Sequence, residues 1–333
     1  MGLHRKIVRF AAALFTGVTL AACQTTPATP APPPIDLTRN SDGTLSMLVN
    51  VDANGTYRVL LDTGSEKSAV NRRTADATGI TTSGQKMNLH GLFSTGKGTF
   101  APGHIISAGP FQSDPALIVL ESDAALRPHG AHGIVGMDFL RSPSRPAGLR
   151  YVSLNFSDLT LSALPKLSFI QRQQKPVWVS LENSSLITTN LAMYPVSLSG
   201  LKGVAVLDSG LSMTVINSAM ARDLTRRTRA EFSMLVDVNG ADIAPAARIT
   251  GKMTALGIKW EGVVVVVQDA PAFKALGLAD TPAMIMGANM LQNLTILMDL
   301  ETGKLAALPP VDKNFKFNVG GDVFMRKKAT QIN

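Results

Sequence analysis

Short apolar runs separated by glycine-containing and polar turns dominate residues 44–310 of this chain. Examples are residues 57–61, 117–120, 204–207 and 263–267. Short apolar runs bounded by turn residues are typical of β-strands, whereas a surface helix needs apolar positions three and four residues apart over a longer span. No long amphipathic helix is evident in the sequence. The pattern therefore predicts an all-β protein with short helices.

The same landmarks occur twice, in the same order, in the two halves of this region. Each half has an apolar run that ends in Asp-[Thr/Ser]-Gly, and an asparagine follows nine residues after the aspartate. The paired segments are 61–65 with 207–211, 87–91 with 236–240, 117–122 with 264–269, 133–140 with 284–291, and 152–161 with 296–305. Self-similarity of this kind predicts a tandem duplication into two lobes of roughly 120 residues, the size of small domains.

The repeats divide the chain into domains. They predict an N-terminal lobe at residues 44–165 and a C-terminal lobe at residues 191–310, joined by a connection at residues 166–190. Residues 311–333 have no counterpart in the first half, and we leave this C-terminal tail without an assigned role.

The first 22 residues have the three parts of a secretion signal. Basic residues come first, an apolar stretch at residues 10–20 follows, and small residues lead to Cys23. The apolar stretch is too short to span a bilayer stably as a helix. Residues 20–23 read LAAC, which resembles the lipobox of bacterial lipoproteins and implies a diacylglycerol on the Cys23 thiol. An ordinary signal peptide with a chance cysteine is the alternative, although Cys23 is the only cysteine in the chain.

Residues 23–43 are interpreted as the lipidated cysteine and a tether, because residues 24–34 are rich in proline, threonine and alanine. This composition cannot make a packed core and gives a semi-rigid spacer. Gln24, rather than aspartate, follows the cysteine, which by resemblance to enterobacterial lipoprotein sorting favours the outer membrane. The predicted location is the bacterial cell envelope, facing the periplasm. With Cys23 used for the anchor no disulfide can form, so the exported domain depends on its core alone.

The chain carries a formal net charge of +8, and removal of the three basic residues in the first 22 leaves +5. The basic residues are scattered, apart from a short cluster at residues 326–328. An exported and only mildly basic chain is not expected to bind nucleic acid. Attraction to anionic lipid or to a cell-wall polymer is compatible with the charge, but no segment of the sequence specifies it.

Asp62 and Asp208 are the main candidates for chemistry. A single Asp-[Ser/Thr]-Gly triplet is a weak signal, because an aspartate after a strand commonly caps a turn. Two triplets with matched surroundings are poorly explained by chance. If the two lobes pack about a pseudo-twofold axis, Asp62 and Asp208 meet at the interface, and two adjacent carboxylates cannot both ionise at ordinary pH. The sequence therefore predicts a pair of aspartates that shares one proton.

The repeats resemble the aspartic protease clan of pepsins and retropepsins. The motif is apolar-apolar-Asp-[Thr/Ser]-Gly followed downstream by apolar-apolar-Gly, seen here as LLDTGS with HGIVGMDFL and as VLDSGL with AMIMGANML. The match covers both lobes, and the short lobes look closer to bacterial retropepsin-like proteins than to pepsin. The resemblance implies a bilobed fold of two closed-barrel-like lobes. It also implies a monomer with an internal pseudo-twofold axis, in which one chain supplies both half-sites.

The resemblance also implies an activity, the hydrolysis of peptide bonds in a peptide or protein substrate without a cofactor or metal. Asp62 and Asp208 would form the catalytic dyad: the ionised member deprotonates a water and the protonated member donates to the amide carbonyl oxygen. Further roles follow for the loop residues. Thr63 and Ser209 would each hydrogen-bond to the backbone of the opposite loop, and Gly64 and Gly210 would allow the close turn. The strands behind the loops would be residues 134–136 and 285–287. The flap hairpins would be residues 90–97 and 239–243.

Position 65 differs between the two copies. Ser65 fits the small residue that follows this glycine in the family, whereas Leu211 is large and is expected to narrow the cleft or displace the second loop. No tyrosine lies between residues 80 and 110, so the flap is expected to be of the glycine-bearing retropepsin type rather than the pepsin type. The alternative function is that of a catalytically inactive envelope lipoprotein that binds a peptide or another envelope component in the cleft.

The remaining polar motifs are interpreted as structural. Asn71 and Asn217 are expected to cap helices or turns. His129 and His132 have H-x-x-H spacing, but no third ligand is evident and glycines flank them, so loop histidines are favoured over a zinc site. The sequence contains no P-loop and no G-x-S-x-G motif.

Overall fold

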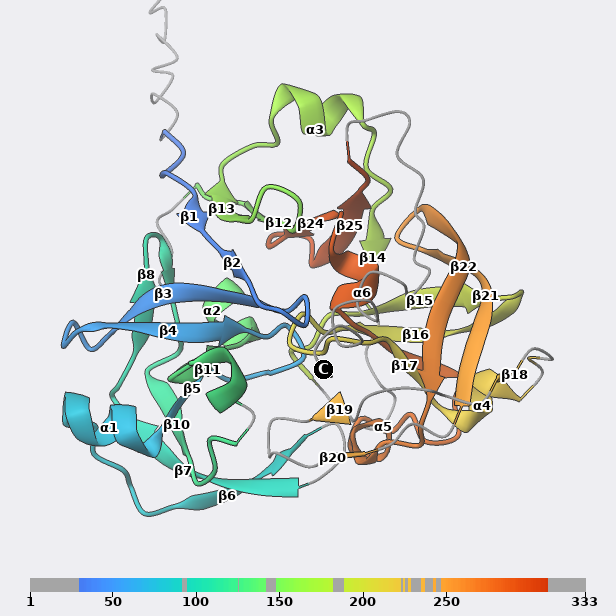
Figure 1. Ribbon diagram of the computed structural model, residues 1–333. Coiled ribbons are helices and arrows are strands. Elements are labelled where there is room, and N and C mark those ends of the chain that lie inside the picture. Colours follow the sequence, from blue (N-terminus) through green and yellow to red (C-terminus); the bar gives the residue numbers. More distant parts are fainter. Residues whose placement is uncertain are drawn as a thin grey trace, which may run out of the picture.

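The computed structural model describes residues 30–91, 95–124, 126–141, 148–181, 189–222, 224, 227–228, 235–236, 242–243 and 247–310. Within them the chain forms two lobes, each built mainly of β-strands, that share a third sheet (Figure 1). The predicted all-β, bilobed fold class is confirmed. The predicted signal peptide, Cys23 and the C-terminal tail lie outside the described residues, and no described helix is long and apolar enough to cross a membrane.

The N-terminal lobe is one sheet with strand order β6-β7-β10-β5-β11-β4-β3-β8-β9, and β2 pairs with β3. Its strands are short, and its two α-helices, of seven and five residues, follow β5 and β11. The elements are β2 (Thr38–Arg39), β3 (Leu45–Val51), β4 (Thr56–Leu61), β5 (Ala69–Asn71), α1 (Arg72–Thr78), β6 (Lys86–His90), β7 (Thr95–Pro102), β8 (Ile106–Ala108), β9 (Phe111–Gln112), β10 (Ala116–Leu120), the 3₁₀ helix η1 (Arg127–His129), β11 (Gly133–Val135) and α2 (Met137–Arg141).

The C-terminal lobe has the order β15-β16-β23-β17-β22-β21-β18, and an additional pairing of β15 with β21 closes six of these strands into a barrel. The elements are β15 (Met193–Leu198), β16 (Leu201–Leu207), β17 (Val215–Ile216), α4 (Ser218–Ala221), β18 (Arg227–Thr228), β19 (Leu235–Val236), β20 (Asp242–Ile243), β21 (Ala247–Ala255), β22 (Ile258–Val267), α5 (Pro271–Ala275), β23 (Ala283–Met286) and α6 (Ala288–Leu291).

The two lobes repeat one arrangement of strands. In the N-terminal lobe β11 lies between β4, to which it is parallel, and β5, to which it is antiparallel. In the C-terminal lobe β23 lies in the same way between β16 and β17. These are the apolar runs of the sequence repeats, and all residues of β11 and β23 are buried. A strand that is covered on both faces needs apolar side chains at every position. The continuous apolar runs of the repeats therefore predict buried strands.

The third sheet joins the lobes, in the order β1-β13-β12-β24-β25-β14. Each lobe contributes one hairpin, and β12 pairs antiparallel with β24 along its whole length. A short strand completes each edge, so the sheet has the same twofold pattern as the lobes. Its strands are β1 (Ile35–Asp36), β12 (Tyr151–Asn155), β13 (Thr160–Leu164), β14 (Val179–Ser180), β24 (Thr295–Asp299) and β25 (Lys304–Leu308), and α3 (Phe169–Gln173) lies between β13 and β14 in the chain.

An ion pair at one end of this sheet also joins the lobes. Arg150 donates to both carboxylate oxygens of Asp299, at 3.0 and 2.6 Å. Burial raises the pKa of Asp299, but hydrogen bonds from Arg150 and Thr302 outweigh this effect and lower the pKa to about 2. The pair therefore contributes stability above the ordinary pKa of an aspartate, and that contribution is lost as the pH falls toward 2.

Two segments that the sequence predicts to be connections contain paired strands. The tether was expected to extend to residue 43, but β1 pairs with β13 and β2 pairs with β3, so the folded part includes both strands. The connection at residues 166–190 contains α3 and also β14, which pairs with β25. Strands of two residues have no readable apolar pattern, because their pairing partners, rather than their own side chains, fix them in the sheet.

Candidate active site

Asp62 and Asp208 lie at equivalent places, one residue beyond β4 and β16. The backbone N–H of Asp62 donates to the carbonyl of Val135 in β11, at 3.0 Å. The N–H of Asp208 donates to the carbonyl of Met286 in β23, also at 3.0 Å. Each aspartate is thus fixed by the buried strand behind it, and each residue as a whole is half-buried.

Gly64 and Gly210 bring the two loops into contact. A β-carbon added to Gly64 would lie 2.5 Å from Cγ of Asp208, and one added to Gly210 would lie 2.5 Å from Cγ of Asp62. Each glycine therefore packs against the carboxyl group of the opposite lobe, where no other residue fits. The structure brings together the two aspartates that the sequence repeats singled out, close enough for each carboxyl group to shift the pKa of the other.

Thr63 and Ser209 make four hydrogen bonds across the same interface, two of them with each other. The Thr63 N–H donates to Oγ of Ser209 at 3.0 Å, and the Ser209 N–H donates to Oγ1 of Thr63 at 2.9 Å. The two hydroxyls in turn donate to the carbonyls of Leu207 and Leu61, at 2.9 and 2.7 Å. Both side chains are fully buried, and each hydroxyl has a donor and an acceptor partner. This closed network holds the two loops in one geometry.

The electrostatics of the pair favour a shared proton. Burial raises the pKa of Asp208 well above its ordinary value, and the nearby Asp62 carboxylate raises it further. Burial also raises the pKa of Asp62, but the backbone N–H of Gly64 and the hydrogen bond with Asp208 oppose this rise. Two groups this close titrate as a pair, in which one proton remains bound where isolated aspartates are ionised.

Comparison with known families agrees with this geometry. The family model described as aspartyl protease matches the chain twice, at residues 48–139 and 194–290. The chain belongs to the aspartyl protease family. Each match spans one aspartate loop together with the glycine segment that follows it downstream, so both lobes carry the family pattern. No curated protein sequence matches the chain.

The second loop is not displaced by Leu211. Its side chain is only 6% exposed and packs into the hydrophobic core. Its N–H donates to Oδ1 of Asp208 at 3.0 Å. Its carbonyl accepts from the N–H of Ala288 at 2.7 Å, just as the carbonyl of Ser65 accepts from Met137 at 2.8 Å. The two loops therefore keep the same backbone hydrogen bond to the short helix that follows each glycine, despite the difference in side-chain size.

Sequence reasoning missed a layer of polar side chains beneath the loops. Ser68 donates to Oδ1 of Asp138 at 2.8 Å, and Thr214 donates to Oδ1 of Asn289 at 2.8 Å. The hydroxyls of Ser68 and Thr214 also accept from the glycine N–H groups of the strands behind, at 3.2 and 3.0 Å. Ser68 and Thr214 each lie six residues after the aspartate of their lobe, and Asp138 and Asn289 each lie two residues after the downstream glycine, Gly136 or Gly287. This equal spacing in the two halves is the sequence signal that could have revealed the polar layer.

Both predicted flap regions contain antiparallel strand pairs. β6 and β7 form one hairpin, and β19 pairs with β20, with Leu235 opposite Ile243. Figure 1 shows both in the lower half of the molecule, away from α3. Helix α5 of the C-terminal lobe contacts β6, so the lobes also meet at this end. Residues 92–94, between β6 and β7 in the chain, and Asn239, between β19 and β20, lie outside the described residues.

The other singled-out polar residues have structural contacts. Asn71 is the N-cap of α1 and Asn217 the N-cap of α4, and each accepts from a backbone N–H at 2.9 Å. These two capping predictions are confirmed. His129 lies 3.7 Å from a carboxylate oxygen of Asp42, whereas the His132 ring packs edge-on against Tyr57.

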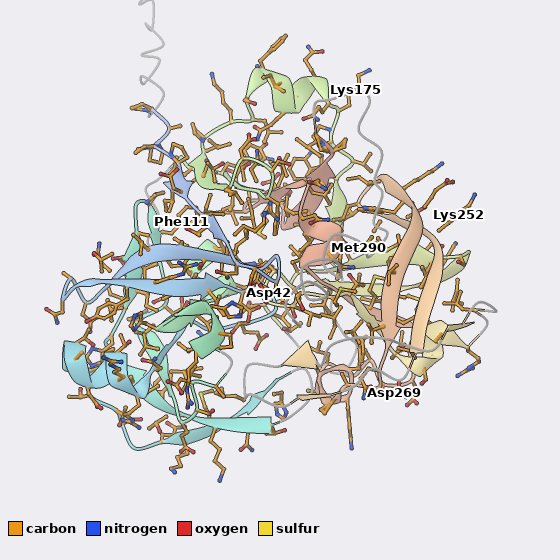
Figure 2. All side chains as sticks on the ribbon, viewed as in Figure 1. Asp42, Phe111, Lys175, Lys252, Asp269 and Met290 are labelled. Atoms are coloured by element: carbon orange, nitrogen blue, oxygen red, sulfur yellow. The ribbon has the colours of Figure 1, made fainter. Side chains whose placement is uncertain are left out.

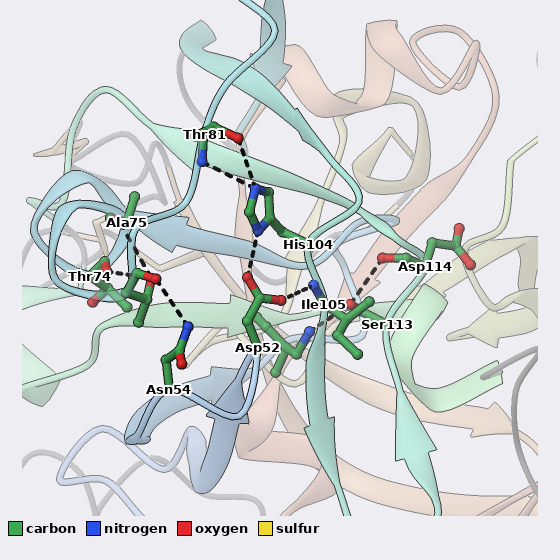
Figure 3. Close-up of polar contacts among 11 residues, drawn as sticks. Asp52, Asn54, Thr74, Ala75, Thr81, His104, Ile105, Ser113 and Asp114 are labelled. Atoms are coloured by element: carbon green, nitrogen blue, oxygen red, sulfur yellow. Dashed lines mark hydrogen bonds and ion pairs between the residues drawn. The ribbon is translucent and has the colours of Figure 1, made fainter.

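A second cluster of chemistry-bearing side chains is centred on His104 (Figure 3). Nδ1 of His104 is paired with Asp52, and Nε2 of His104 lies 3.2 Å from the Thr81 hydroxyl. The three side chains are connected in the same sequence as in an Asp-His-hydroxyl catalytic triad. However, the same Nε2 also accepts the backbone N–H of Thr81 at 3.1 Å. The imidazole therefore fastens the loop after α1 to the turn between β3 and β4, and it is not poised to deprotonate a nucleophile.

Proposed function

We propose that the protein is an aspartic endopeptidase that hydrolyses peptide bonds with a water molecule held between Asp62 and Asp208. The observation that carries this proposal is the close approach of the two carboxyl groups, each packed against the glycine of the opposite loop. The raised pKa of Asp208 beside Asp62 supplies an acid and a base at one place.

The roles follow from the two protonation states. Asp62, the ionised member, accepts a proton from the water while the water oxygen bonds to the carbonyl carbon. Asp208 donates its proton to the carbonyl oxygen, which gives a neutral diol on that carbon. The C–N bond then breaks as Asp62 delivers its proton to the leaving nitrogen and Asp208 recovers one from a diol hydroxyl. The dyad ends in its starting state, and no metal or cofactor takes part.

The hairpins β6–β7 and β19–β20 are proposed to close over an extended substrate. Peptides that add to a site as a strand gain main-chain hydrogen bonds whatever their side chains, which suits an endopeptidase. One chain supplies both aspartates, so we propose a monomeric enzyme. The lipobox-like sequence before Cys23 supports a lipid anchor in the bacterial envelope, with the outer membrane favoured by Gln24.

A binding-only function has lost its main support. Leu211 was the residue expected to disturb the second loop, and its side chain is buried in the core while the loop keeps its hydrogen bonds. The dyad geometry therefore favours catalysis.

The test is cleavage of a peptide mixture by the purified protein between acid and neutral pH, carried out in H₂¹⁸O. We expect new peptide termini, each with one ¹⁸O atom in the new carboxyl group, because the nucleophile is water. A hydroxyl analogue of the tetrahedral intermediate should inhibit cleavage. If no peptide is cut at any pH but the analogue still binds, the binding-only function replaces the proposal.

A further inference from the structure

The segment between the lobes carries an exposed apolar surface. Among the described residues, four large hydrophobic side chains are prominently exposed, namely Leu48, Phe169, Ile170 and Val177. Three of them lie within nine residues of sequence, in α3 and just after it, and they are 68%, 57% and 53% exposed in chain order. An apolar group of this kind on a soluble domain marks an interaction site.

Helix α3 is oriented with its polar side toward the protein. Gln171 donates to Oγ of Ser153 in the shared sheet at 3.3 Å, and Gln174 donates to the carbonyl of Pro309 at 2.7 Å. Phe169 and Ile170, at the start of the helix, face the solvent instead. A surface helix normally buries its apolar side, so this reversed orientation leaves Phe169 and Ile170 accessible to a partner outside the domain.

The same surface is basic. Lys166, Arg172 and Lys175 are all exposed, and residues 160–181 contain no aspartate or glutamate. Figure 2 shows Lys175 projecting beside α3 at the upper end of the molecule. None of the three makes an ion pair with another described residue. We define the α3 surface as these three basic residues together with Phe169, Ile170 and Val177.

Half-buried aromatic rings lie beside the α3 surface. The rings of Tyr151 and Trp178 are in tilted contact, with centroids 6.0 Å apart. Both pack against the small cluster formed by Leu167 and residues of β24 and β25. Tyrosine and tryptophan at the edge of an apolar surface are typical of sites at a membrane–water interface, because each ring has an apolar body and a polar group.

The position of the α3 surface matches the position of the chain that leads to Cys23. In Figure 1 the described chain begins next to β1 at the upper end of the molecule, the end that also carries α3. Residues 24–34 number eleven and, even fully extended, reach at most about 40 Å. An anchor at Cys23 would therefore keep this end of the domain close to the bilayer, and the flap hairpins lie in the lower half of the molecule, away from α3.

We propose that the α3 surface docks on the anionic phospholipid headgroups of a bilayer. Phe169, Ile170 and Val177 insert at the headgroup boundary, and Lys166, Arg172 and Lys175 contact lipid phosphates. Docking fixes the orientation of the domain, so that the cleft opens away from the membrane. The surface acts independently of peptide hydrolysis, and a variant that lacks activity still docks.

Tryptophan fluorescence provides a local readout of docking. The chain has two tryptophans: Trp178 beside the α3 surface, and Trp260, which is 1% exposed in the core of the C-terminal lobe. The full chain is mixed with vesicles of phosphatidylglycerol and phosphatidylethanolamine whose acyl chains carry bromine, a contact quencher. We expect quenching of Trp178 only, and co-sedimentation of the protein with the vesicles. Vesicles of phosphatidylcholine alone should quench several-fold less.

Variants identify the surface. Phe169→Asp with Ile170→Asp should abolish the quenching, whereas Leu48→Asp should not, because Leu48 is equally exposed (62%) but lies on β3. Replacing Lys166, Arg172 and Lys175 by glutamine should weaken binding to anionic vesicles at least about tenfold. The matched control replaces Arg72, Arg73 and Lys97, which are exposed on α1 and β7.

Several results would overturn the proposal. One is co-sedimentation without quenching of Trp178, which would show that another part of the chain holds the vesicle. Others are an absence of co-sedimentation, equal effects of Leu48→Asp and the double variant, or dimerisation through α3 that persists in the presence of vesicles.

Discussion

Replacing Asp62 or Asp208 by asparagine is expected to reduce peptide cleavage at least about 10³-fold, since each variant removes one of two proton-transfer groups. The same changes are expected to make the fold more stable at neutral pH. The two carboxyl groups are held together by the loops, and burial raises the pKa of each. An amide in place of one carboxyl group removes the unfavourable ionisation while it keeps the size of the side chain.

The sign of the stability change depends on pH. A carboxyl group whose pKa is raised in the folded state contributes stability that is fully present below its unfolded pKa, about 3.9, and is lost as the pH rises through its folded pKa. The melting temperatures of wild type and Asp208→Asn should therefore coincide near pH 3 and separate toward pH 7, with the variant higher. Activity that survives either substitution, or a variant that is less stable at neutral pH, would contradict the account.

Replacing Gly64 by alanine is expected to reduce kcat at least about 100-fold, because the new methyl group would occupy the position of the Asp208 carboxyl group, 2.5 Å from its Cγ. The loops cannot separate without breaking the hydrogen bonds between Thr63 and Ser209. Stability should also fall, by about 1–3 kcal/mol, as in other overpacked sites. Steady-state kinetics measure the loss of kcat, and urea unfolding measures the loss of stability. Gly210→Ala is expected to show both effects.

Gly251 provides the matched control for this substitution. A β-carbon there would also lie 2.5 Å from another atom, but that atom is Oγ of Ser199, the end of a side chain that can rotate away. Gly251→Ala on β21 should therefore leave kcat within about twofold of wild type, because only steric effects at the dyad alter the catalytic geometry. Equal loss of activity in Gly64→Ala and Gly251→Ala would indicate general destabilisation instead of contact between the loops.

The two aspartates could be predicted from the sequence because the evidence for each is local: the aspartate directly follows an apolar strand in the chain. The apolar runs at residues 57–61 and 204–207 indicate buried strands, and the glycine two residues after each aspartate indicates a tight turn. The duplication then places the two loops at one interface without any long-range information. The fold class followed from the same local signals, repeated in the same order.

Other features could not be read from local pattern. Ser68 and Asp138 are 70 residues apart in the chain, and only the pairing of β11 with β4 and β5 brings them together. The direction of the Leu211 side chain depends on the path of the loop, and it points into the core. Phe169 and Ile170 would be assigned to a core by composition alone, yet the glutamines of α3 determine which side faces the sheet.

The most direct test of the shared-proton dyad is the pH dependence of kcat/KM for one cleaved peptide. The account predicts a bell-shaped profile, whose acid limb reports loss of the ionised base and whose alkaline limb reports loss of the proton held at Asp208. The alkaline limb should lie well above the ordinary range of an aspartate. A profile with a single limb, or one that is flat from pH 3 to pH 7, would contradict catalysis by a proton shared between Asp62 and Asp208.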